Sequence, residues 1–298
     1  MAKASQPATP VNFAVPANAC DCHVHVFGDP AKFPFSPSRT YTPELASIEE
    51  LRSLHRALDI SRTVIVQASV YGTDNSCTLD AIRRYGVGAR GVAVIDDSTT
   101  PRTLDDMHRG GIRGVRINLG VGGHNDPDLA RQRLRSCLQQ IKNRGWHVQI
   151  FTNLQVIAAI DEEVAAADVP IVFDHFGAAK AALGVQQPGF DRLLHLVQNG
   201  KAYVKLSGVY GVSNHAPDYA DVAPLARALI AANAERVLWG TDWPHPDSSP
   251  HPGRKSTDIF PLFSIDDGRI LNQLPLWAPE AAQRRRILVD NPARLYGF

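Results

Sequence analysis

Residues 20–26 read CDCHVHV, and this short apolar run is the first of eight in the chain. The other seven are RTVIVQAS, RGVAVI, RGVRINL, WHVQIF, VPIVFD, KAYVKLS and RVLWGTD, at residues 62–69, 90–95, 113–119, 146–151, 169–174, 201–207 and 236–242. Short runs that are rich in β-branched residues and bounded by turn residues are typical of buried strands. We therefore predict eight strands.

The segments between these runs have the apolar periodicity of helices. Examples are IEELRSLHRALD, DLARQRLRSCLQQIKNRG, QVIAAIDEEVAAAD and YADVAPLARALIAANA, at residues 48–59, 128–145, 155–168 and 219–234. Eight alternations of strand and helix predict an α/β fold of the TIM type, a (β/α)8 barrel that forms a single domain over residues 19–298. The alternative is a doubly wound open sheet, but no G-x-G-x-x-G motif follows the first strand.

Composition narrows the range of partners. The chain has 298 residues, 44% of them hydrophobic, which is enough for a large core. Its 31 basic and 30 acidic side chains give a net charge of +1 without a run of like charge, which argues against nucleic acid or membrane partners. Four cysteines without a C-x-x-C pair suit a reduced, cytoplasmic protein.

Two segments stand apart from the alternating pattern. Residues 1–18 contain scattered prolines and lack the apolar stretch of a secretory signal, so we expect a flexible N-terminal arm. Residues 243–275 are rich in Pro, Ser and Asp and predict a long loop, which in a compact domain is usually a lid or a mobile segment.

Polar residues gather where the predicted strands end, which is the face that carries function in such barrels. They are His23, His25, Ser69, Arg116, Asn118, His175, Lys205 and Asp242. His23 and His25 are two residues apart and point to one face of a regular strand. An isolated H-x-H could be a buried structural pair, but a third histidine and a strand-terminal aspartate could join it in binding a divalent metal with an open position for water. Without metal, the same groups could polarise a carbonyl and deprotonate water.

Two more histidines have other expected places. His147 lies near the beginning of its predicted strand, far from the functional face, so we expect a structural role. His245 follows Asp242 by three residues, and both a place in the site and a structural place in the turn PHP are open.

Several motifs resemble a known family. The H-x-H of residues 23–25, DHFG at 174–177 and WGTDWPHP at 239–246 are similar to the amidohydrolase superfamily, of the amidohydrolase-2 type. FPFSPSRTYTP at 33–43, VIVQASVYGTDN at 64–75 and ILVDNPARLYGF at 287–298 resemble its branch of 2-pyrone-4,6-dicarboxylate lactonase, galactarolactone isomerase and 4-sulfomuconolactone hydrolase. The resemblance extends from about residue 20 to residue 298.

The resemblance implies a lactone substrate and assigns roles to the polar residues. Asp242 matches the general base for water, and His23, His25 and His175 match groups that polarise the lactone carbonyl or hold zinc. Members with two metals carry a lysine on the fourth strand and a histidine late in the fifth, where this chain has Arg116 and IFTN. We therefore expect one divalent ion at most, with His23, His25, His175 and Asp242 as candidate ligands, and its requirement stays open.

The substrate contacts are expected to be fewer than in the pyrone enzyme, because its additional arginines have no counterpart here. Arg116 remains as the bidentate partner of a carboxylate, and the other candidate contacts are Tyr41, Ser69, Asn118 and Lys205. The predicted function is hydrolysis of an anionic lactone of the muconolactone, pyrone carboxylate or sugar-acid type, in aromatic compound catabolism. Isomerisation by intramolecular acyl migration, metal-dependent decarboxylation and a non-catalytic binding barrel are the alternatives.

Overall fold

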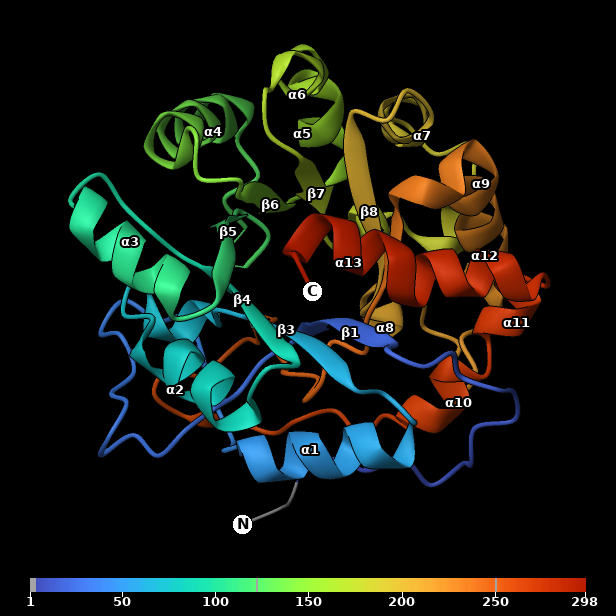
Figure 1. Cartoon of the computed structure of the whole chain (residues 1–298), viewed down its shortest axis with the longest axis horizontal. Helices are drawn as coiled ribbons and strands as arrows, with labels where there is room; N and C mark the ends of the chain where they lie inside the picture. The colour runs from blue at the N-terminus through green and yellow to red at the C-terminus, as the bar shows by residue number, and fades with distance from the viewer. Residues whose placement is uncertain (1–3, 122, 250) are drawn as a thin grey trace.

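A sheet of eight parallel strands forms the centre of the molecule (Figure 1). The structure is a computed structural model that describes residues 4–121, 123–249 and 251–298. In chain order and in sheet order the strands are β1 (Cys20–Val24), β3 (Arg62–Val66), β4 (Ala89–Ala93), β5 (Ile112–Asn118), β6 (His147–Phe151), β7 (Ile171–Phe173), β8 (Ala202–Leu206) and β9 (Val237–Trp239). Each predicted run overlaps one of these strands.

The sheet closes on itself between its first strand and the residues that follow its last. Val24 and Trp243 form a parallel bridge, and the backbone N–H of His25 donates to the carbonyl of Trp243 at 2.7 Å. The backbone N–H of Asp242 donates to the carbonyl of His23 at 2.9 Å. These bonds make the sheet a barrel and confirm the predicted TIM-type fold.

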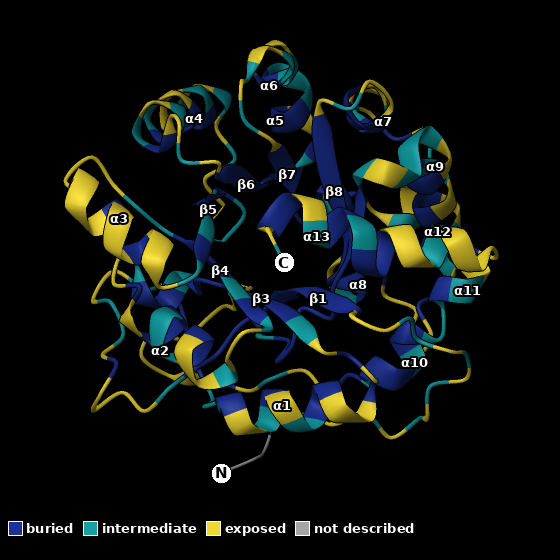
Figure 2. Ribbon diagram, in the orientation of Figure 1, coloured by how far each residue is buried: buried dark blue, intermediate teal, exposed yellow. Residues whose placement is uncertain are grey.

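Helices surround the barrel and bury one face each against it (Figure 2). α1 shows why: Ser47 and Glu50 form a capping box at its start, and Leu51 and Leu54 of its apolar stripe are buried. The larger helices are α1 (Ile48–Ala57), α2 (Ser76–Tyr85), α3 (Pro101–Arg109), α4 (Pro127–Ile141), α5 (Leu154–Ala159), α6 (Asp161–Ala166), α7 (Phe190–Gln198) and α9 (Ala223–Asn233). The four segments predicted as helical all contain helices, although residues 155–168 are divided into α5 and α6.

The C-terminal helices cover the amino end of the barrel. α12 (Ala281–Arg285) leads through a π-helical turn (Arg286–Asp290) into α13 (Asn291–Tyr296), whose Tyr296 packs among the strand side chains of the barrel interior (Figure 1). The ring of His147, the first residue of β6, lies 5.2 Å from that of Tyr296, and its Nδ1 is 2.8 Å from the carbonyl of Arg113. The structure therefore places His147 at the end opposite the expected site.

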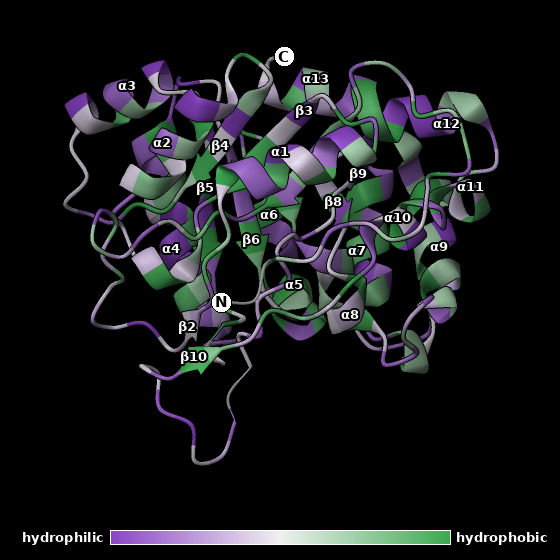
Figure 3. Cartoon of the chain, turned by 90° about the horizontal axis from the view of Figure 1, so that it is seen from below, coloured by the Kyte–Doolittle hydropathy of each residue, from purple (hydrophilic) through white to green (hydrophobic). Residues whose placement is uncertain are grey.

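The predicted loop at residues 243–275 meets the loop that follows β1 (Figure 3). β10 (Ile259–Phe260) pairs in parallel with β2 (Thr42–Pro43), and the Thr42 hydroxyl donates to the carbonyl of Ser256 at 2.7 Å. The segment also contains α10 (Asp267–Leu271) and the start of α11 (Leu274–Trp277), whereas residue 250 lies outside the described residues. A short helix, α8 (Val209–Val212), follows β8 at the same end of the barrel.

Part of the predicted N-terminal arm is bound to the barrel. The Thr9 hydroxyl donates to Asp266 Oδ2 at 2.6 Å, and the indole N–H of Trp243 donates to the carbonyl of Ser5 at 3.1 Å. Residues 1–3 lie outside the described residues, so the flexibility of the arm stays a prediction. Within the described parts of the chain, no helix is long and apolar enough to cross a membrane.

Candidate active site

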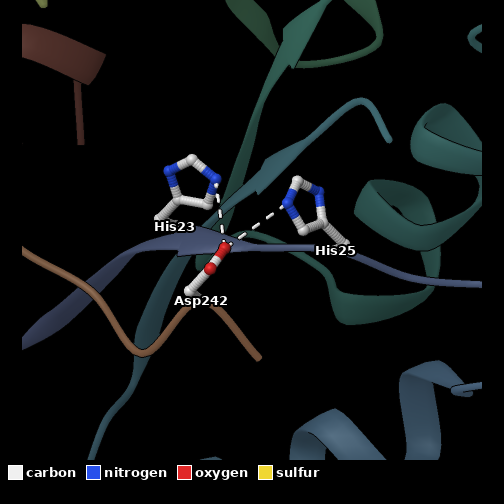
Figure 4. Close-up of side chains that lie close together, drawn as sticks. All are labelled: His23, His25 and Asp242. Carbon is white, nitrogen blue, oxygen red and sulfur yellow. Dashed lines mark ion pairs between the residues drawn. The ribbon is translucent and has the colours of Figure 1, made fainter. Parts of the chain in front are cut away.

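Three histidines and an aspartate meet at the carboxyl end of the barrel, and Figure 4 shows His23, His25 and Asp242 of this group. Oδ1 of Asp242 lies 3.5 Å from Nε2 of His23, 3.5 Å from Nε2 of His25 and 3.9 Å from Nε2 of His175. His23 lies in β1 and His25 just after it, His175 lies two residues after the end of β7, and Asp242 lies in the segment after β9. The structure thus brings together the four residues predicted as the catalytic group.

In each ring the other nitrogen, Nδ1, is already engaged. Nδ1 of His25 lies 2.8 Å from the carbonyl of Val66, and because a carbonyl only accepts, this nitrogen carries the proton. Nε2 of His25 faces Asp242 Oδ1. Nδ1 of His175 lies 2.9 Å from the hydroxyl of Ser207. All three Nε2 atoms are consequently directed at one carboxylate oxygen.

The backbone is strained at two of the four residues. Asp242 has φ +67° and His175 has φ +48°, a left-handed conformation that non-glycine residues rarely adopt. Such strain persists only where the surrounding structure holds it, and it concentrates at functional sites. At Asp242 the backbone N–H donates to His23 and the carbonyl accepts from the N–H of His245 at 2.9 Å.

A buried charged network lies beneath the histidines. Oδ2 of Asp174 accepts from Nε of Arg116 at 3.1 Å and from Nε2 of Gln149 at 3.0 Å. The ammonium of Lys205 donates to Oε1 of Gln149 at 2.6 Å and lies 3.2 Å from Nδ1 of His23. Burial would raise the pKa of Asp174, but His23, Lys205 and Arg116 hold it well below its usual value. The Asp174 carboxylate is therefore ionised and balances two buried cations.

Burial and neighbouring charges also shift the pKa values of Asp242 and His23. Burial would raise the pKa of Asp242, but its contacts with His175, His25 and His23 hold it below its ordinary value, so the carboxylate is ionised. Burial, assisted by the charge of Lys205, lowers the pKa of His23 well below its usual value. The Tyr210 hydroxyl donates to Oδ2 of Asp242 at 2.6 Å, which leaves Oδ1 for chemistry.

These donors fit a single divalent cation. A ring nitrogen of His23, a ring nitrogen of His25 and an oxygen of the ionised Asp242 lie within 4.8 Å of one another, and imidazole nitrogen and carboxylate oxygen are ligands of divalent metals. Among the described residues, Nε2 of His23 and Oδ1 of Asp242 are buried without a hydrogen-bond partner. Zinc takes nitrogen and oxygen ligands at about 2.0–2.2 Å in a tetrahedron, so ligand atoms roughly 3.5 Å apart suit it. A second group of His23, Asp174 and His175 suits a cation less well, because Lys205 and Arg116 already neutralise Asp174.

A cavity of about 420 Å³ collects most of the predicted substrate contacts. Ser69, Arg116 and Asn118 line it, with residues of the loops after β3 and β4 and of α4. Among the hydrogen bonds formed by the described residues, Arg116 uses only Nε, so its two terminal nitrogens are available to a ligand. Tyr41 is buried beside Ser69; burial raises its pKa to about 12 despite the opposing hydrogen bond with Ser69, so it is a hydroxyl donor.

Lys205 is not among the residues that line this cavity. Its side chain is fully buried beneath the histidines, and its hydrogen bond goes to Gln149. It also lies near Nδ1 of His23 and Oδ1 of Asp174, and the expected direct contact with the substrate stays a prediction. His245 is also separate, because its Nε2 pairs with Oδ2 of Asp267 at 3.1 Å.

Sequence reasoning missed Asp174, Gln149 and Tyr210 as members of the site. Asp174 ends an apolar run directly before His175, and Gln149 is a lone amide within the run WHVQIF, so both had a recognisable signal. Tyr210 lies in α8, the short helix after β8, whose direction only the fold determines, and no sequence pattern identifies its bond to Asp242.

The arrangement defines a class of protein. The family described as Amidohydrolase matches residues 20–298, and the chain belongs to this family. The predicted family is therefore confirmed.

Individual relatives cover nearly the whole chain. The 4-sulfomuconolactone hydrolase of Hydrogenophaga intermedia is 37% identical over 97% of this chain and 91% of its own length. The 2-pyrone-4,6-dicarboxylate hydrolase of Comamonas testosteroni is 35% identical over 98% and 94%. The D-galactarolactone isomerase of Agrobacterium fabrum is 29% identical over 97% and 94%. The relatives thus include lactone hydrolases and a lactone isomerase, which are the members of the branch that the motifs resemble.

Proposed function

We propose that the protein hydrolyses an anionic lactone. The observation that carries this proposal is the ionised carboxylate of Asp242, buried among three imidazoles with one oxygen held by Tyr210 and the other without a protein hydrogen bond among the described residues. Such an oxygen is placed to take a proton from water. Identity of 37% to a lactone hydrolase over nearly the whole chain supports the same reaction.

In the proposed reaction the substrate anion binds the terminal nitrogens of Arg116, and Ser69, Asn118 and the hydroxyl of Tyr41 orient the ring. Asp242 Oδ1 takes a proton as the oxygen of water forms a bond to the lactone carbonyl carbon. The ring C–O bond then breaks, and protonated Asp242 gives the proton to the departing ring oxygen. The product is a ring-opened hydroxy acid or its keto form.

We propose that the site holds one divalent ion, zinc. His23, His25 and either His175 or Asp242 would be its ligands, which leaves a position open for water, and the ion would supply Lewis-acid polarisation of the carbonyl when bound. The hydrogen bond from His25 Nδ1 to Val66 and the contact of His175 Nδ1 with Ser207 support this, because metal-binding imidazoles are usually oriented through their second nitrogen. Arg116, where two-metal members carry a lysine, supports a single ion.

The substrate class follows from the charge of the pocket. A guanidinium with two available nitrogens favours a carboxylate or a similar anion on the lactone, and muconolactones, pyrone carboxylates and the lactones of sugar diacids all carry one. The names of the relatives support a place in aromatic compound catabolism. Four free, buried cysteines support a cytoplasmic location.

Lactone isomerisation is the second candidate, favoured by the relative named D-galactarolactone isomerase. The same Asp242 oxygen would take the proton from a hydroxyl of the substrate instead of from water. That hydroxyl would attack the carbonyl carbon, and the original ring oxygen would receive the proton.

The purified protein, with its metal content measured by elemental analysis, decides between these candidates. Its products from a panel of muconolactones, pyrone carboxylates and aldonolactones are identified by mass and NMR. A ring-opened acid, heavier than the substrate by one water, is expected. An isomeric lactone of unchanged mass would establish the isomerase, and no turnover of any lactone would contradict both and favour a binding barrel.

A further inference from the structure

Asp21, in β1, is a fully buried carboxylate outside the group of residues around Asp242. Its Oδ1 accepts from the backbone N–H of Thr241 at 3.0 Å and from that of His23 at 3.2 Å. Its Oδ2 accepts from the Thr241 hydroxyl at 2.6 Å and lies 3.3 Å from Nε2 of His55 in α1. Four polar groups therefore converge on one carboxylate, and two of them belong to the residue before Asp242.

The bonds continue to the other side of Asp242. The hydroxyl of Thr241, besides donating to Asp21, accepts from the backbone N–H of Trp243 at 3.0 Å. Asp21 thus holds the residues on both sides of Asp242, directly at Thr241 and through one hydroxyl at Trp243. Since Asp242 itself has φ +67°, a strained conformation, external bonds of this kind are what keep it in place.

An irregularity in β1 makes this double role possible. The register between β1 and β3 shifts between Asp21 and Val24, as at a β-bulge. In a regular strand Asp21 and His23 would lie on one face. Here Asp21 contacts His55 of the surrounding α1, whereas His23 contacts Lys205 in the barrel interior. The irregular segment of β1 therefore supplies both His23, an imidazole of the site, and Asp21, which holds the residues on either side of Asp242.

We propose that Asp21 is a positioning residue of the reaction: it fixes the backbone of residues 241–243 so that Oδ1 of Asp242 faces the three Nε2 atoms. This inference rests on the proposed function, in which Asp242 is the base. A displacement of a reacting group by about 1 Å can lower a rate on the order of 100-fold. The loss should fall on kcat, because Asp21 touches none of the residues that line the cavity for the substrate.

Tyr85, which lies on the side of His55 away from Asp242, offers a control for the role of Asp21. Nδ1 of His55 lies 2.9 Å from the hydroxyl of Tyr85 in α2. Tyr85→Phe removes this outer bond and leaves the bonds from Asp21 to Thr241 intact. Thr241→Val keeps the size of the side chain and the charge of Asp21 but removes the hydroxyl that links Asp21 to Trp243.

The test measures kcat, KM and Tm for Asp21→Asn, Thr241→Val, Tyr85→Phe and Asp242→Asn, with the lactone that the wild type turns over. We expect kcat to fall about 10- to 100-fold in Asp21→Asn and in the same direction in Thr241→Val, with KM changed less than about threefold. Tyr85→Phe should keep kcat within about twofold, whatever its Tm.

The outcomes distinguish a failure of the positioning role of Asp21 from a failure of the base role of Asp242. Wild-type kcat in folded Asp21→Asn, or in Thr241→Val if Asp21→Asn does not fold, overturns the positioning role, and so does an equal loss in Tyr85→Phe. If Asp242→Asn keeps near-normal turnover, the proposed base is wrong, and any loss in Asp21→Asn then has another origin.

Discussion

Two buried aspartates, Asp242 and Asp267, each lie beside histidine, and they differ in what their surroundings do to them. Three imidazoles surround Asp242, and their influence outweighs burial and keeps its pKa low, while the Tyr210 hydroxyl donates to its second oxygen. Asp267 has one such partner, His245. Burial raises the pKa of Asp267, and His245 offsets this only in part.

The ring of Tyr210 lies between the two groups, 5.5 Å from that of His245 and bonded to Asp242. Asp267 and His245 thus form a closed pair that ties α10 to the segment after β9. A buried histidine beside an aspartate therefore does not by itself mark a site. Convergence of several Nε2 atoms on one carboxylate oxygen distinguishes the group around Asp242.

Asp242→Asn should produce the largest effect. The amide cannot accept the proton of water, so we expect kcat to fall about 10²- to 10⁴-fold. Circular dichroism should show an intact barrel. Near-normal turnover by the folded variant would remove the distinction between Asp242 and Asp267.

Zinc binding should show the second-largest difference between the group around Asp242 and the pair of Asp267 and His245. Calorimetric titration of the chelator-treated protein with Zn²⁺ should give one equivalent per chain. Ser207→Ala, which frees Nδ1 of His175, should weaken zinc binding about 10- to 100-fold. Ser213→Ala is the matched control, since this buried hydroxyl donates to Asp221 instead. Two equivalents, or equal weakening in both variants, would contradict the single site.

A moderate effect is expected at Arg116, which connects the charged network to the cavity. Arg116→Lys keeps a cation for Asp174 but loses the planar fork, so KM should rise about tenfold or more with a smaller change in kcat. Arg116→Met should raise KM further. An unchanged KM in both variants would show that the arginine serves only to neutralise Asp174.

Asp267→Asn should have the smallest effect on the reaction. It removes the charged partner of His245, whose hydrogen bond contributes about 1.5–3 kcal/mol to stability, so Tm should fall by several degrees. Its kcat should stay within about threefold of the wild type. A loss of kcat comparable to that of Asp242→Asn would place the pair inside the catalytic group after all.

Much of the site could be predicted from local pattern. The eight apolar runs specify the strands, and strand ends in a parallel barrel share one face, so His23, His25, His175 and Asp242 had to meet there. Arg116, Ser69 and Asn118 reach the cavity for the same reason. The direction of Lys205 was harder to predict, because its depth in the barrel depends on the tilt and register of all eight strands.

Apolar periodicity and the position of a residue along its strand are local properties, so the barrel and the grouping of three histidines with Asp242 could be read from the sequence. The partners of those residues could not. Tyr210 bonds Asp242 from 32 positions away, and Asp21 bonds Thr241 from 220. The irregularity of β1, which turns Asp21 and His23 to different neighbours, arises from pairing with β3. Contacts of this kind depend on how distant segments pack, and packing is a property of the whole chain.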